Sequence, residues 1–414
     1  MPSRAGAVEV AWVLAAVYYF YQYALRSAPA VMMPQLADAF GLTTVAMASM
    51  AGVFYYGYSA FSLVAGTAID RLGARAVLPA GALLTGCGAF LFASGDVSAA
   101  NVGRVLQGCG GAFALVGAIY IASNNFPSSR AATLTGAAQM FGMAGGSAGQ
   151  VLVGPLIARG VSWVSFWTGM GFLGVIIAAA LFTLLPGKPE PAHTASKQAA
   201  IPALFTVFKN PQTVLCGVIA GLMFIPTTIF DMIWGVRYLQ EAHGFGYGDA
   251  VMRSATVPLG WIIGCPLLGM ISDRLGRRKP VIVGGALVLL GCLTWILYGP
   301  TEVFPPYSIG LIAGIASGAA MLTYTVSKEA NAPHLSGTAT GAVSFLNLTF
   351  SALVGPIFGR IMKSLGGAQS PLESFQNTFQ PLLYGVALSI VLTLVLRETG
   401  RAVRVPLVTA AEAA

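Results

Sequence analysis

Long apolar stretches joined by short polar connections fill almost the whole of this chain of 414 residues. An α-helix needs about 20 apolar residues to cross the hydrocarbon of a bilayer. The stretches of about that length lie at residues 9–36, 46–69, 76–94, 100–124, 132–158, 162–185, 211–236, 249–271, 279–299, 306–327, 338–362 and 379–396. The first, fifth and eleventh are longer, and we expect them to tilt or to extend beyond the lipid. The pattern therefore predicts an all-α membrane protein with twelve transmembrane helices.

A polar, proline-rich segment at residues 186–198 separates the first six stretches from the other six. Segments of this composition do not form a fold of their own. We therefore expect an N-terminal six-helix bundle at residues 1–186, a linker at 187–208, and a C-terminal six-helix bundle with a short tail at 209–414.

The composition supports a membrane protein. Hydrophobic residues make up 56% of the chain and charged residues 9%, whereas about 25% of the residues in a soluble domain are charged. The mean hydropathy is +0.76, and the first apolar stretch is too long for a cleavable signal peptide. We expect an integral multi-pass protein of a bacterial inner membrane, a monomer surrounded by the lipid bilayer.

Positive charge is unevenly distributed between the connections. Fifteen lysines and arginines fall on the side of the predicted membrane that holds both termini, and four fall on the other side. Since cytoplasmic connections carry such an excess, both termini are expected in the cytoplasm. The net charge of +8 is thus explained by basic residues in the cytoplasmic connections, which set the orientation of the chain in the membrane. The chain has no basic stripe interleaved with aromatic residues, so the charge does not indicate a nucleic-acid partner.

The sequence offers no site for catalysis, a metal ion or a cofactor. All five cysteines lie within apolar stretches without CxxC spacing, and the three histidines fall in connections. The phosphate-binding pattern Gly-x-x-x-x-Gly-Lys-[Ser/Thr] is missing, so ATP does not power this protein directly. The connections are also too short for a catalytic domain. We therefore expect no enzyme activity, no metal and no cofactor.

A decapeptide occurs twice, at equivalent points of the two halves. The segment Gly66-Thr-Ala-Ile-Asp-Arg-Leu-Gly-Ala-Arg75 returns 203 residues later as Gly269-Met-Ile-Ser-Asp-Arg-Leu-Gly-Arg-Arg278. Each copy joins the end of one apolar stretch to the start of the next. A repeat with this spacing indicates two similar halves that face each other around a central site.

The decapeptide resembles the hallmark of the major facilitator superfamily, and the resemblance covers essentially the whole chain. It implies two six-helix bundles and secondary transport by alternating access. Gly66 and Gly269 would let helices approach closely, and the second glycine of each copy suits a tight turn. The aspartates can meet arginines and helix N-termini across the seam between the halves. The first copy departs from the usual pattern at Ala74. The residues expected to act as conformational latches rather than substrate contacts are Asp70, Arg71, Gly73, Arg75, Asp273, Arg274, Gly276 and Arg277.

Further charged positions also resemble elements of this superfamily. Arg104, in Arg-Val-Leu-Gln-Gly-Cys-Gly, is similar to the arginine motif of the fourth helix. A charge inside hydrocarbon normally faces the bundle interior, where Arg104 would serve coupling or stabilise a gate; the alternative is an arginine that reaches the outer surface.

Lys328 and Glu329 end the tenth stretch. They either serve a cytoplasmic gate or are ordinary exposed charges.

The first apolar stretch carries a tyrosine-rich segment followed by an arginine, Tyr18-Tyr-Phe-Tyr-Gln-Tyr-Ala-Leu-Arg26. With Pro34 it resembles the first helix of the organophosphate and organic-anion antiporters, in which the arginine clasps the anionic group. Tyr19, Gln22 and Arg26 follow one face of a helix and are expected to contact the substrate. A planar guanidinium matches carboxylate or phosphate. The alternative is a structural arginine bonded to carbonyl groups of a neighbouring helix.

The seventh stretch departs from that branch. The phosphate antiporters have a second arginine there, whereas this chain has Asp231. An acidic residue would repel a dianionic phosphate. Arg26 in one half and Asp231 in the other therefore favour a zwitterion, or a monoanion carried with a proton, because a carboxyl group shielded from water holds a proton readily. The alternative is a pair of Asp231 with Arg237 or Arg253 near the outer surface.

The cluster Tyr55-Tyr56-Gly-Tyr58 and Tyr324 are candidates to line the central cavity, with Tyr56 and Tyr324 expected to contact the substrate, although aromatic residues at helical spacing also serve packing. The expected function is secondary active transport of a small organic anion or zwitterionic carboxylate, coupled to protons or to exchange. A dipeptide or a sugar phosphate is the alternative substrate. A solute sensor that signals to another membrane protein is the alternative function.

Overall fold

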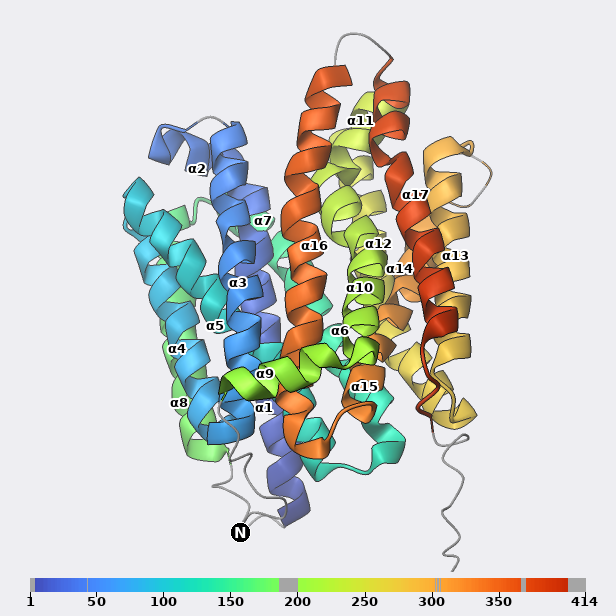
Figure 1. Cartoon of the computed structure of the whole chain (residues 1–414). Coiled ribbons are helices and arrows are strands. Elements are labelled where there is room, and N and C mark those ends of the chain that lie inside the picture. The colour runs from blue at the N-terminus through green and yellow to red at the C-terminus, as the bar shows by residue number, and fades with distance from the viewer. Residues whose placement is uncertain are drawn as a thin grey trace, which may run out of the picture.

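A computed structural model describes residues 4–42, 44–185, 200–301, 303, 305, 307–365 and 370–400. Within these residues the chain forms helices and no strands. The helices of the N-terminal half stand beside those of the C-terminal half, on the left and on the right in Figure 1. The prediction of an all-α fold is confirmed.

Each half contains six passages along the bundle. Those of the N-terminal half are α1 (Arg4–Ser27), α3 (Thr44–Leu72), α4 (Ala74–Ala93), α5 (Val97–Asn125), α6 (Ala131–Val151) continued by α7 (Val153–Ala158), and α8 (Trp163–Leu184). Those of the C-terminal half are α10 (Pro211–Ile225) continued by the π-helix η3 (Pro226–Gly235) and α11 (Val236–His243), α12 (Tyr247–Leu275), α13 (Lys279–Tyr298), α14 (Ser308–Ser317) continued by η4 (Gly318–Met321) and α15 (Leu322–Glu329), α16 (Ser336–Leu365), and α17 (Pro371–Val395).

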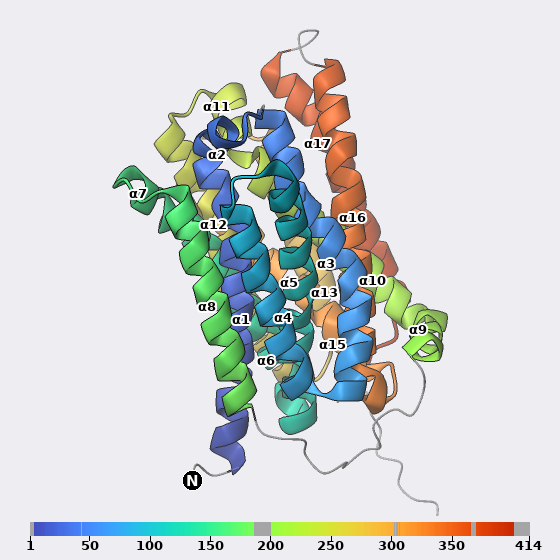
Figure 2. The same cartoon turned by 90° about the vertical axis from the view of Figure 1, so that its left-hand side faces the viewer.

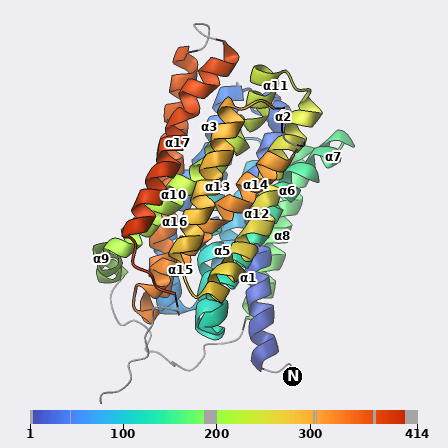
Figure 3. The same cartoon turned by 90° about the vertical axis from the view of Figure 1, so that its right-hand side faces the viewer.

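Nine candidate spans among the described residues are long and apolar enough to cross a membrane. The remaining passages are α1, α3, and α6 with α7. They pack among the others, α1 against α5 and α6, and α3 against α5 and α16. Views from either side show these helices running along the same direction as their neighbours (Figures 2 and 3). The twelve predicted passages are therefore all present.

The first passage ends earlier than the predicted residue 36. Helix α1 stops at Ser27, and a 3-10 turn η1 (Ala28–Met32) leads into the short α2 (Met33–Phe40). Pro29 explains the break, because a proline disfavours the helical conformation of the preceding residue and has no backbone N–H to donate. The first apolar stretch is therefore long because it contains α1, a break at Pro29 and the start of α2, rather than one tilted helix.

The end of the predicted linker is helical, and the segment 186–198, for which no fold of its own is expected, lies outside the described residues. Residues 200–209 form α9 (Ala200–Lys209), whereas residues 186–199 lie outside the described part of the chain. Helix α9 buries Ala203 and Val207, and it packs against α3 of one half and α16 of the other. The second part of the linker therefore touches both halves.

The last passage begins at Pro371 rather than at the predicted residue 379. Ser370 caps the backbone of Glu373, and Glu373 caps Ser370 in return. This capping box fixes the start of α17. Its polar residues lower the local hydropathy, which is why hydropathy placed the start too late.

The two halves meet at one end of the bundle, which we call the repeat end because both copies of the decapeptide lie there. The start of α1 and helix α9 lie towards the same end (Figure 1). Helix α3 meets α16, and α12 meets α6. A Cβ atom on Gly66 would lie 2.5 Å from the backbone oxygen of Gly337. One on Gly269 would lie 2.7 Å from that of Ala132. These glycines therefore permit the close helix approach that the sequence predicted.

We expect Gly66→Ala to push α3 away from α16, because the added methyl group would overlap a backbone oxygen. The population should shift towards a state open at the repeat end. Spin labels on the exposed Leu72→Cys and Leu275→Cys, in a Cys87→Ser background that removes the exposed cysteine, would report a longer distance.

Gly52→Ala is the matched control, because a Cβ atom there has nothing within 4 Å and alanine favours a helix. It should leave the label distance unchanged. An unchanged distance in Gly66→Ala as well would show that this glycine contact does not hold the repeat end closed.

Candidate functional site

A small cavity, which we call the central cavity, lies between the two halves. The N-terminal half contributes Tyr19, Tyr23, Arg26, Tyr58, Leu115 and Gln139. The C-terminal half contributes Phe224, Thr228, Tyr324, Ser344, Asn347 and Leu348. Its volume is about 20 Å³, room for about one water molecule. The halves must therefore separate before an organic solute can enter.

Arg26 projects into this cavity from the last turn of α1. Its Nε and Nη2 atoms donate hydrogen bonds to the Tyr55 hydroxyl, at 3.2 and 3.0 Å. Its guanidinium carbon lies 4.7 Å from the ring centre of Tyr23 and 4.6 Å from that of Tyr55. The ion pairs between described residues involve other arginines. Arg26 is thus held by aromatic faces and one hydroxyl, without a carboxylate partner among the residues that the structure describes.

Hydroxyl and amide groups from both halves surround Arg26. Tyr19 donates to Gln139 at 2.9 Å, and Gln139 donates to the Tyr23 hydroxyl at 3.3 Å. On the other side, Asn347 donates to the Tyr324 hydroxyl at 3.2 Å. The Asn347 side-chain oxygen is buried without a partner in the structure. The structure therefore brings the predicted Tyr19, Arg26 and Tyr324 together.

Two predicted contacts lie elsewhere. Gln22 is fully buried and lines neither described cavity; its Oε1 atom lies 2.9 Å from the position of a Cβ on Gly111 in α5. Tyr56 is 57% exposed and also lines neither cavity. Its neighbour Tyr55 bonds Arg26 instead. Ser59, one helical turn after Tyr55, bonds Thr349 of α16 at 2.9 Å, so Tyr55 lies on the face of α3 that meets the other half.

Arg104 lies inside the N-terminal bundle, with 1% of its surface exposed. It donates to the backbone oxygen of Leu25 at 3.2 Å and to that of Ala51 at 3.1 Å. It also donates to the Gln107 side chain at 2.7 Å. Arg104 therefore joins α1 and α3 to α5, and it does not reach the outer surface.

The aspartate of the first decapeptide crosses the seam between the halves. Asp70 accepts hydrogen bonds from the backbone N–H groups of Gly337 and Thr338, at 2.8 and 2.7 Å, and from the Thr338 hydroxyl at 2.6 Å. These donors belong to the first turn of α16, where unpaired N–H groups and the helix dipole favour an anion.

The second decapeptide makes the corresponding contact with the other half. Asp273 accepts from the backbone N–H and the hydroxyl of Thr133 in the first turn of α6, both at 2.9 Å. It also pairs with Arg278 at 2.6 Å, and Arg278 pairs with Glu329 at 2.9 Å. Lys328 crosses the seam as well, donating to the Ser123 hydroxyl at 2.7 Å.

The other latch candidates divide into turn residues and exposed charges. Gly73 and Gly276 have φ of 79° and 63°, a conformation that favours glycine. Arg278, absent from the predicted latch residues, is 2% exposed and makes the ion pairs. The predicted arginines that lie on the surface instead are Arg71, Arg75, Arg274 and Arg277.

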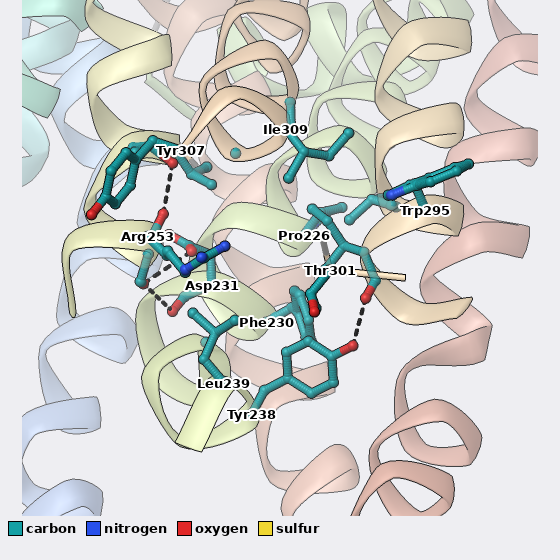
Figure 4. A pocket seen from close by; sticks show the side chains of 18 of the residues that line it. Pro226, Phe230, Asp231, Tyr238, Leu239, Arg253, Trp295, Thr301, Tyr307 and Ile309 are labelled. Atoms are coloured by element: carbon teal, nitrogen blue, oxygen red, sulfur yellow. Dashed lines mark hydrogen bonds between the residues drawn. The ribbon is translucent and has the colours of Figure 1, made fainter. Parts of the chain in front are cut away.

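Asp231 lines a second, larger cavity inside the C-terminal half, which we call the outer cavity (Figure 4). Its volume is about 100 Å³. Ser254 donates to Asp231 Oδ1 at 3.0 Å, while Oδ2 is buried without a hydrogen-bond partner in the structure. Arg253 lines the same cavity, but no ion pair joins it to Asp231. The structure therefore does not bring Asp231 and Arg26 to one site.

No group of three histidine, cysteine, aspartate or glutamate residues in the described part of the chain could hold a metal ion. Neither cavity thus contains a metal site built from described residues. The chemistry available in both is charge pairing and hydrogen bonding.

Comparison with curated proteins finds transporters. A hexuronate transporter of Bacillus subtilis (strain 168) is 27% identical over 285 residues. The match covers 66% of this chain and 66% of that relative, just under two thirds of its length. A probable nitrate/nitrite transporter of Mycobacterium tuberculosis (strain CDC 1551 / Oshkosh) is 25% identical over 68% of this chain and 71% of its own. A probable sulfoacetate transporter of Cupriavidus necator is 22% identical over 85% of this chain and 87% of its own.

Solved structures share the fold. The proton:xylose symporter XylE bound to 6-bromo-6-deoxy-D-glucose superposes with a TM-score of 0.71 at 16% identity, over 96% of this chain and 98% of its own. The transporter FucP in the outward conformation gives 0.70 at 16% identity, over 94% and 99%. A family model described as Major Facilitator Superfamily matches residues 15–356. The chain is therefore a multi-pass membrane transporter, not an enzyme, and it belongs to the Major Facilitator Superfamily.

Proposed function

We propose that this protein carries a small organic anion across a bacterial inner membrane by alternating access, with Arg26 binding the anionic group. The observation that carries the proposal is the guanidinium in the central cavity, which has no carboxylate partner among the described residues. A charge held away from water is unfavourable unless it is paired. A carboxylate or similar group on the solute would supply the pair.

The curated relatives support an anionic solute. Their names give hexuronate, nitrate or nitrite, and sulfoacetate as the substrates of those proteins. These compounds differ in size and share negative charge. The common feature is the one that an unpaired guanidinium would recognise.

The central cavity favours a solute with a single negative charge. Arg26 is the one charged side chain among the described residues that line it. A sugar phosphate would call for a second cation. A dipeptide would call for an acidic partner for its ammonium group, and Asp231 lies in the outer cavity. We therefore rank a monoanion above both alternative substrates.

Coupling follows from the charge of the solute. Moving one negative charge into a cell against the membrane potential is unfavourable by about 2.3 kcal/mol per 100 mV. Accumulation of the anion against this potential therefore needs coupling, and we propose that a co-transported proton or exchange for another anion supplies it. We also place the repeat end in the cytoplasm, so the seam contacts close the central cavity towards that side.

Arg26→Lys keeps the positive charge and loses the planar fork. We expect uptake of the anion into proteoliposomes to fall by about 10- to 100-fold in kcat/KM, because a hydrogen bond to a charged group contributes about 1.5–3 kcal/mol. Labelled glucuronate, sulfoacetate and nitrate are the probes, each tested with an inward proton gradient and with anion-loaded vesicles.

Arg237→Lys is the matched control, because Arg237 is an exposed residue of α11 that pairs with Glu241. It should transport like the unchanged protein. Normal transport by Arg26→Lys would exclude a bidentate clasp. Uptake of an uncharged sugar without uptake of any anion would overturn the proposed substrate class.

Asp70 and Asp273 are proposed as latches that hold the repeat end closed. In Asp70→Asn and Asp273→Asn the charge that faces the helix N-terminus is lost, although the side chain keeps its size. We expect the labels at Leu72→Cys and Leu275→Cys to report a larger open population, and solute affinity in a conformationally trapped form to stay within about twofold.

Asp249→Asn provides the control for these variants, since Asp249 is exposed in the first turn of α12. Its label distances should match those of the unchanged protein. Loss of binding by Asp70→Asn in the trapped form would identify Asp70 as a solute contact and contradict its role as a latch.

A further inference from the structure

The outer cavity presents two opposite charges that are not paired with each other. Asp231 is 8% exposed, and Ser254 fixes one of its oxygens at 3.0 Å. The other oxygen, Oδ2, has no hydrogen-bond partner in the structure, and neither does the buried Nε of Arg253. Figure 4 shows both side chains on the same wall of the cavity. One unsatisfied acceptor and one unsatisfied donor thus belong to a single enclosed space.

Aromatic rings hold the guanidinium of Arg253 at the rim. Its central carbon lies 4.1 Å from the ring centre of Phe245 and 5.9 Å from that of Tyr307. Such contacts stabilise a cation and leave its N–H groups able to donate. The carboxylate of Asp231 is likewise held by Ser254 with one oxygen left over. Both charges are therefore positioned before any ligand arrives.

We propose that the outer cavity is a second solute site, which binds a small zwitterion with its ammonium group on Asp231 and its carboxylate on Arg253. A simple cation would be repelled by Arg253, and a simple anion by Asp231. A molecule that carries both charges satisfies both residues. The volume of about 100 Å³ has room for several water molecules, which suits a short amino acid such as alanine.

The remaining walls suit such a ligand. Phe230, Leu239, Leu293 and Ile309 supply an apolar surface for a short side chain. Thr301 and Tyr307, which flank the connection between α13 and α14, also line the cavity. Helix α13 ends, and α14 begins, towards the end of the bundle opposite the repeat end (Figure 1). The outer cavity therefore lies towards that end.

This site is separate from the central cavity, although the two share one helix. On η3, Thr227 lines the outer cavity and Thr228 lines the central one. The proposal therefore does not depend on the proposed function of Arg26. A variant that disables one cavity leaves the charged residues of the other in place.

Binding of labelled L-alanine to the purified full chain in lipid nanodiscs tests the proposal. Acetate and methylamine, which carry one charge each, are the comparison ligands. We expect alanine to bind and neither comparison ligand to compete at equal concentration. Asp231→Asn and Arg253→Gln should each weaken alanine binding at least tenfold, whereas Arg26→Lys and the exposed control Arg237→Gln should leave it unchanged.

Each other outcome overturns the proposal. Binding that is lost in Arg26→Lys but kept in Asp231→Asn would assign alanine to the central cavity. Competition by acetate alone would identify an anion site. Failure of every probe to bind would show that the cavity holds water only. Arg253→Gln replaces a partly exposed side chain, so it remains informative even if Asp231→Asn does not fold.

Discussion

Two carboxylates join the halves at the repeat end by binding backbone N–H groups of helices in the opposite half. Asp70 meets the first turn of α16, and Asp273 meets the first turn of α6. The free N–H groups and the dipole of a helix start make these positions favourable for a negative charge. Because Gly66 and Gly269 bring the backbones together, the same contacts set the distance between the halves. The size of the central cavity follows from that distance.

The electrostatics of the N-terminal half are arranged around two buried guanidinium groups. Arg104 donates to the backbone oxygens of Leu25 and Ala51. Leu25 directly precedes Arg26, and Ala51 precedes Tyr55 by one helical turn. Arg104 therefore fixes both helices that hold the contact between Arg26 and Tyr55. Carbonyl dipoles and aromatic faces stabilise these cations without neutralising them, so the half keeps a positive potential suited to an anion.

The passages and the turn in each decapeptide were predictable from sequence because both depend on local pattern: about 20 apolar residues cross a bilayer, and each copy places a glycine where the turn needs a positive φ. Helix phase explains two predictions that the structure does not support. Tyr56 is exposed whereas its neighbour Tyr55 bonds Arg26, because one residue rotates a side chain by about 100° around a helix. Asp231 lies on the π-helix η3, whose wider turn alters the directions expected from α-helical spacing. Neither the phase of α3 nor a π-helix is visible in hydropathy.

The two latches are equivalent in sequence but unequal in their surroundings. In the second copy, Arg278 pairs with Asp273 and with Glu329, and Thr399 donates to Glu329 at 2.6 Å. Arg75 holds the corresponding position in the first copy and is exposed. Asp273 therefore belongs to a charge network within the C-terminal half as well as bonding α6, whereas Asp70 bonds α16 without an ion pair among the described residues.

This inequality changes what each seam leaves behind when the halves separate. Asp273 keeps Arg278 as a partner after it leaves Thr133, because that ion pair lies within the C-terminal half. The hydrogen bonds of Asp70 to described residues go to the first turn of α16, so separation leaves its charge without those partners, and a carboxylate held away from water without a partner is unfavourable. Helix α9 lies against both α3 and α16, so the linker between the halves spans the seam at which Asp70 loses its partners. A fold built from two similar halves is thus asymmetric at its seams, because among the described residues an ion-pair network lies beside Asp273 and not beside Asp70.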